Sequence, residues 1–156
     1  MKPLSIVFAA SLALGLSAPL LAQTVEVSGV WARATVPGQK ATGAFMHLMS
    51  KNGARLVAAS TPVAGVAEVH EMKLEEGVMR MRAVPGGLDL PPGKMVELKP
   101  GGYHLMLMDL KQPLQKESTI ALTLVFQDAK GTETRTELKV PVGMQPPADA
   151  GAAAKP

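Results

Sequence analysis

The chain has 156 residues, a formal net charge of +3 at neutral pH, 10 methionines, 3 histidines and no cysteine. Its length suggests one domain. The absence of cysteine excludes disulfides, lipid attachment to a cysteine and the thiolate ligand that a blue-copper electron-transfer site needs. Basic residues are spread along the chain and aromatic residues are scarce. The chain therefore lacks the clustered basic and aromatic residues of a nucleic-acid-binding surface, and no nucleic-acid partner is expected.

The N-terminus has the pattern of a secretory signal peptide. Lys2 precedes an apolar run from Ile6 to Leu16, and small residues follow. We expect residues 1–22 to be this signal, cleaved after Ala22, with Ala18 as the alternative position. The run is short for a membrane span and no second run follows, so the mature protein is expected to be exported, without a membrane span.

The rest of the chain predicts short strands joined by turns rich in glycine and proline. Alternating or apolar segments cover residues 25–31, 42–49, 55–60, 66–74, 78–84, 95–98, 103–108, 118–126 and 132–140. Glu75-Glu76-Gly77 predicts a hairpin turn, and residues 85–93 predict a short link between turns. The sequence therefore predicts an all-β, Greek-key β-sandwich over residues 23–143. Residues 144–156, mostly proline, alanine and glycine, are predicted to form a disordered tail.

Histidine and methionine recur two residues apart in two predicted strands, as His70-Glu71-Met72 and His104-Leu105-Met106. Met79-Arg80-Met81 repeats the alternation with two methionines. Residues i and i+2 of a strand point to the same face, so each segment presents its soft donors together. Imidazole and thioether ligands, with no thiolate, favour Cu(I) over Mg²⁺ or Ca²⁺.

The spacing of these donors resembles that of a known family. Ten residues separate His70 from Met81, twenty-two separate Met81 from His104, and Met106 follows two positions later. The chain thereby resembles the periplasmic copper chaperone family associated with assembly of the Cu(A) centre of cytochrome oxidase. That family's signature is a histidine, ten residues, a methionine, about twenty-one residues and then His-x-Met. The longer interval here falls where loops are expected, and loops tolerate insertions. The resemblance covers residues 25–142.

The resemblance implies a cupredoxin-like sandwich that binds one Cu(I) near its surface through His70, Met81, His104 and Met106. Ag(I), which prefers the same ligands, is an alternative cargo. The resemblance also implies a periplasmic protein whose partner is the apo-cytochrome oxidase copper domain or another copper carrier. We expect this protein to be a monomer. Some relatives have a tail rich in histidine and methionine, whereas the tail here contains no histidine and a single methionine, Met144.

Other methionines and the third histidine have simpler interpretations. Methionine on a strand usually fills a core, and this interpretation is preferred for three residues: Met46, Met49 and Met95. His47 is interpreted as a surface or packed residue. Three further methionines share faces with the proposed ligands and are alternative donors: Met72, Met79 and Met108.

Two further functions compete with copper delivery. A metal-free β-sandwich could bind protein or envelope components through its methionines, and a copper-binding protein could serve in buffering or resistance. An enzyme is not expected, because the chain has no nucleophile elbow, no zinc-protease motif and no serine beside His70 or His104.

Overall fold

The computed structural model describes residues 25–148, so the predicted signal peptide and residues 149–156 of the predicted tail lie outside it. The ten strands are β1 (Val25–Arg33), β2 (Ala41–Ser50), β3 (Ala54–Ser60), β4 (Ala64–Glu75), β5 (Val78–Ala83), β6 (Leu88–Leu90), β7 (Met95–Leu98), β8 (His104–Leu110), β9 (Thr119–Gln127) and β10 (Glu133–Gly143). Between residues 25 and 148 no helix is long and apolar enough to cross a membrane.

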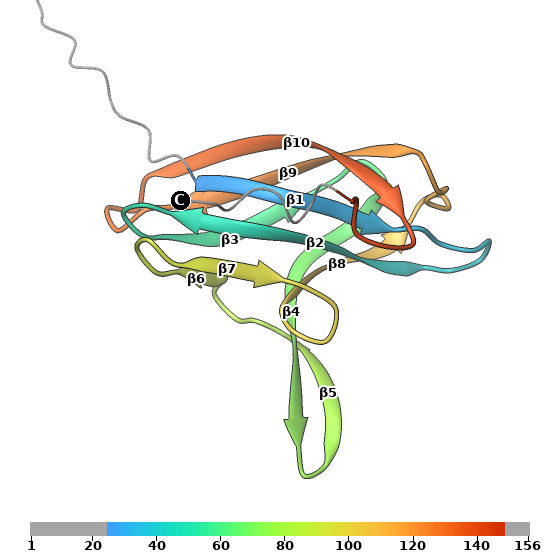
Figure 1. Cartoon of the computed structure of the whole chain (residues 1–156), viewed down its shortest axis with the longest axis horizontal. Helices are drawn as coiled ribbons and strands as arrows, with labels where there is room; N and C mark the ends of the chain where they lie inside the picture. Colours follow the sequence, from blue (N-terminus) through green and yellow to red (C-terminus); the bar gives the residue numbers. More distant parts are fainter. Residues whose placement is uncertain (1–24, 149–156) are drawn as a thin grey trace, which may run out of the picture.

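The strands follow the hydrogen-bonded order β5-β4-β8-β2-β1-β10-β9-β3-β6, and β7 also pairs with β2. Strand β1 runs parallel to β10 and joins two layers whose strands pair antiparallel (Figure 1). Neighbours in the sheet are often far apart in sequence, since the chain crosses between the layers after β2, β3, β5, β6 and β8. The predicted all-β, cupredoxin-like Greek-key sandwich is confirmed.

The core lies between the two layers and is made mainly of leucine. Alternate residues of each strand face it, as the two-residue period of a strand requires. The leucines that are almost fully buried are Leu48, Leu56, Leu90, Leu98, Leu105, Leu107, Leu114, Leu122 and Leu124. Because Leu105 faces this core, His104 and Met106 on either side of it point to the opposite, outer face of the sheet.

The hairpin of β4 and β5 projects from the body of the sandwich (Figure 1). Glu75 pairs with Val78, so two residues make the turn. Both of them, Glu76 (φ 51°) and Gly77 (φ 80°), have the left-handed conformation that a tight type I′ hairpin needs. The predicted hairpin turn is therefore correct, and every residue of β5 is exposed.

All nine predicted strands are present, and the structure adds a tenth, β6. This three-residue strand pairs with β3 through Leu88 opposite Leu56 and Leu90 opposite Ala54. Its sequence lies between a pair of glycines and a pair of prolines, which predicted only turns. Tertiary contacts make the strand, because Leu88 and Leu90 bury their side chains in the core.

Candidate metal centre

The two predicted histidine ligands meet across neighbouring strands. His70 of β4 lies directly opposite His104 of β8 in the antiparallel register. Their ring centroids are 6.0 Å apart, with the ring planes inclined at 56°. Met106 follows His104 at two residues and so shares its face. The pairing of β4 with β8 thus brings together three of the four predicted ligands.

Each imidazole has one nitrogen held by the protein and one nitrogen left free. The His104 Nδ1 atom lies 3.0 Å from the backbone oxygen of Gly102. A carbonyl oxygen only accepts hydrogen bonds, so Nδ1 carries the hydrogen and Nε2 keeps its lone pair. That Nε2 atom is buried and has no hydrogen-bond partner.

His70 shows the same arrangement with the two nitrogens exchanged. Its Nε2 atom lies 3.0 Å from a carboxylate oxygen of Glu68, which places the hydrogen on Nε2. Its Nδ1 atom is buried without a partner. Buried polar atoms in proteins are nearly always hydrogen-bonded, so two unpartnered nitrogens on neighbouring rings need an explanation. Metal-bound histidines characteristically donate their other N–H to a carboxylate or a carbonyl. Together with the thioether sulfurs of Met81 and Met106, these imidazole nitrogens therefore fit a soft metal ion.

A hollow of about 290 Å³ opens on this outer face of the sheet. Its soft lining atoms come from four residues: Met72, Met81, His104 and Met106. Met72 of β4 lies directly opposite Met81 of β5, and its backbone N–H donates to the Gly102 oxygen at 3.2 Å. The same carbonyl thus fixes the backbone of Met72 and the ring of His104. His70 lies beside the hollow, next to His104, and does not line it.

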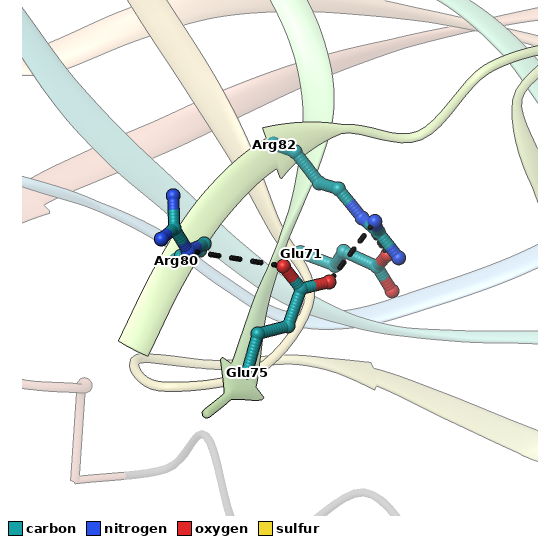
Figure 2. Close-up of polar contacts among 4 residues, drawn as sticks. All are labelled: Glu71, Glu75, Arg80 and Arg82. Atoms are coloured by element: carbon teal, nitrogen blue, oxygen red, sulfur yellow. Dashed lines mark hydrogen bonds and ion pairs between the residues drawn. The ribbon is translucent and has the colours of Figure 1, made fainter. Parts of the chain in front are cut away.

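The β4–β5 hairpin carries its charged side chains on one face and its sulfur donors on the other. Glu71 pairs with Arg82 in the register, and their side chains approach to 2.8 Å. Glu75 contacts Arg82 at 3.2 Å and Arg80 at 3.8 Å (Figure 2). The Glu71 carboxylate raises the pKa of the Arg82 guanidinium above its ordinary value. The two arginines turn away from the methionines, as the two-residue period of a strand requires, so no positive charge of this hairpin faces the hollow.

Aromatic packing closes the hollow on the side of β2. Gly43 lies opposite Met106, and the Phe45 ring covers Gly43 so closely that a Cβ there would come within 2.8 Å of it. Trp31 stacks on Phe45 with ring centroids 4.7 Å apart, and the Arg33 guanidinium lies 5.6 Å from the Phe45 centroid. Glycine at position 43 is what lets the ring approach the site.

The structure decides between the methionines that were considered as alternative donors, and it adds Glu68 to the candidate centre. Met72 lines the hollow, whereas Met79 and Met108 do not. Met46 is buried in the core as expected. Met95 is 39% exposed and Met49 is only partly buried on the outer face of the sheet, so the interpretation of these two as core filler was wrong. Glu68 was missed, although its position two residues before His70 on the same strand face was a signal for a carboxylate beside that ring.

The fold and these side chains define an all-β sandwich with a candidate centre of imidazole and thioether donors on its outer face. A protein-family model, described as "Putative lipoprotein LpqE-like", matches residues 25–142. The chain belongs to this LpqE-like family. It is 31% identical over 118 residues to the protein named "Putative lipoprotein Lxx21020" of Leifsonia xyli subsp. xyli, covering 76% of this chain and 71% of that one.

Solved structures of similar fold are PCuAC domains and related proteins. The copper-bound PCuAC domain from PmoF2 has a TM-score of 0.60 at 20% identity, covering 78% of this chain and 93% of the domain. The apo form of DR1885 from Deinococcus radiodurans has a TM-score of 0.55 at 28% identity and covers 92% of this chain and 93% of that one. The CuI form of DR1885 also has a TM-score of 0.55 at 28% identity, with 85% of each chain covered.

Proposed function

We propose that this protein is an exported Cu(I) chaperone that binds one copper ion through His70, Met81, His104 and Met106. The observation that carries the proposal is the pair of buried imidazole nitrogens, His104 Nε2 and His70 Nδ1, that have no hydrogen-bond partner. Each ring donates its other N–H to the protein, so both lone pairs are available to a metal. The likeness to DR1885, solved in a CuI form, supports the same cargo.

The ligand types favour a soft, monovalent ion. Thioethers select Cu(I), and Ag(I) has the same preference, whereas Zn²⁺ prefers thiolate, imidazole and carboxylate ligands. Among residues 25–148, no group of three or more His, Cys, Asp or Glu side chains is placed to hold a metal ion. A site that needs two methionine sulfurs to be complete suits copper in its reduced state.

The position of the site suits transfer of the ion to another protein. Met81 is 50% exposed on a hairpin that projects from the body, whereas His104 is buried. A partner can therefore replace the thioether of Met81 first and reach the imidazoles last. Met72, which faces Met81 across the hairpin, is an alternative sulfur donor that could hold the ion during such an exchange.

The proposed recipient is the apo-cytochrome oxidase copper domain or another copper carrier. This assignment is supported by the His-x₁₀-Met and His-x-Met spacing that resembles the oxidase-assembly chaperones. The proposed location is the periplasm, reached through the signal in residues 1–22. The relative named as a lipoprotein supports export, while the absence of cysteine from these 156 residues leaves no cysteine for a lipid. We propose no enzymatic activity.

Copper transfer is the experiment that tests this function. The Cu(I)-loaded protein is mixed with the apo-oxidase copper domain under reducing conditions, the two are separated, and copper in each is measured. Net movement of copper to the oxidase domain supports delivery. If the protein binds Cu(I) tightly but keeps it in the presence of the oxidase domain, the result would support buffering or resistance instead. Failure to bind copper at all would favour the metal-free binding module.

Competition between metals gives a prediction about selectivity. Cu(I) should remain bound when Zn²⁺ is added at equal concentration, because two of the four donors are thioethers that zinc does not favour. The measurement is bound metal after gel filtration under reducing conditions. Displacement of copper by equimolar zinc would contradict the proposed donor set.

Replacing Met81 with leucine gives a prediction about the ligand set. Met81→Leu keeps the size of the side chain and removes its sulfur, so the free energy of unfolding should fall by less than about 1.5 kcal/mol. Cu(I) affinity should fall at least about tenfold, since losing even an outer-sphere partner typically costs that much. Met144→Leu is the control, because Met144 is also exposed but lies outside the hollow. Equal affinities of the two variants would show that Met81 is not a ligand.

A further inference from the structure

A second histidine and methionine pair lies on β2, outside the centre described above. His47-Leu48-Met49 repeats the tripeptide His104-Leu105-Met106. The middle leucine is fully buried in both copies. Strand geometry therefore turns His47 and Met49 together to the outer face of the sheet, where both side chains are partly exposed.

Strand β7 adds a third soft donor to this face. Met95 lies directly opposite Met49, and Glu97 lies directly opposite His47. Directly opposed residues of antiparallel strands have Cβ atoms about 4.5–5.5 Å apart, so their side chains are in reach of each other. Met95 is 39% exposed, which is unusual for a methionine that only fills space. One imidazole and two thioethers thus gather on adjacent strands.

Two glutamates lie opposite these donors in the neighbouring strands. Glu26 of β1 lies opposite Met49 on the other side of β2, and Glu97 faces His47. Lys99, whose Nζ lies 3.0 Å from Glu97, lowers the pKa of that carboxyl, and the charge of His47 makes a smaller contribution in the same direction. An ionised carboxylate beside His47 can accept the N–H of its ring, as Glu68 does for His70, and leave the other nitrogen free for a metal.

This cluster shares one sheet face with the first centre but none of its ligands. Gly43 of β2 lines the hollow, and His47 lies four residues further along the same strand, about 14 Å at the usual rise per residue. Phe45 lies between the two positions, stacked on Trp31. Two ions could therefore be bound at the same time, separated by an aromatic pair.

We propose that His47, Met49 and Met95 form a second site for Cu(I) or Ag(I). With three donors at a more open surface, it binds less tightly than the first centre. The proposal does not depend on the chaperone function, since it needs only the donors of β2 and β7.

Stoichiometry with a chromophoric Cu(I) chelator tests the proposal on the full chain under reducing conditions. The parent protein should bind two copper ions in two affinity classes. The Met49→Leu/Met95→Leu double variant should keep the tight class and bind the second ion at least tenfold more weakly. Met144→Leu should behave like the parent. A parent that binds one ion only, or a double variant that keeps the weaker class, would overturn the second site.

Two further measurements separate this proposal from the first centre. The Met81→Leu/Met106→Leu variant should lose the tight class and retain the weaker one, so either site can fail without the other. In spectra of methionine methyl groups, the second equivalent of Ag(I) should shift the signals of Met49 and Met95 and leave Met144 unchanged. Absence of those two shifts would contradict the proposed ligands.

Discussion

His104→Ala should reduce Cu(I) affinity by more than about 100-fold. Removal of a residue that only orients a metal ligand typically costs 10- to 100-fold in affinity, so removal of a ligand should exceed that range. His104 occupies the middle of the centre, opposite His70 in the register and on the same strand face as Met106. Affinity is measured by competition with a Cu(I) chelator, and thermal unfolding verifies that the variant is folded.

His70→Ala and His47→Ala serve as comparisons for this prediction. The first should also weaken tight binding strongly, because His70 Nδ1 is the other unpartnered buried nitrogen. The second should leave the tight class unchanged, since His47 lies outside the hollow. A folded His104→Ala protein with the affinity of the parent would refute the proposed centre.

Leu105→Ala should lower the free energy of unfolding by about 2–5 kcal/mol, as expected for a leucine truncated in a packed core. Leu105 is fully buried between the two layers and fixes the direction in which His104 and Met106 point. Chemical denaturation followed by circular dichroism measures the change. Leu74→Ala is the matched control, because Leu74 is 64% exposed on the β4–β5 hairpin and should cost less than about 0.5 kcal/mol. Similar losses for both variants would contradict the assigned core.

Local patterns were sufficient to predict most strands, because alternation and turn residues act over a few positions. The turn at Glu76-Gly77 follows from its turn residues, and the direction of Arg80 and Arg82 away from the methionines follows from the two-residue period of a strand. Strand β6 could not be predicted, since three residues between turns become a strand only by pairing with β3. The parallel pairing of β1 with β10 likewise joins residues more than one hundred positions apart.

Within the candidate centre, the sequence predicted which donors share a strand face and that β4 and β5 form a hairpin, but not that β8 lies beside β4. The pairing of His70 with His104 depends on the register of β4 against β8, which no local pattern encodes. The presence of Met72 in the hollow depends on its register with Met81. Met95 was assigned to the core because methionine on a strand usually fills one. Its exposure follows only from the pairing of β7 with β2, which sets Met95 opposite Met49.

X-ray absorption at the copper edge, on protein loaded with less than one equivalent of Cu(I), tests whether these histidines and methionines bind the ion. We expect a copper(I) edge and a mixed coordination shell, with nitrogen scattering that shows the outer-ring pattern of imidazole and sulfur scattering from thioethers. The sulfur contribution should decrease in Met81→Leu and stay unchanged in Met144→Leu. A shell of nitrogen and oxygen alone, or a sulfur contribution unaffected by Met81→Leu, would contradict the assignment of His70, Met81, His104 and Met106 as the copper ligands.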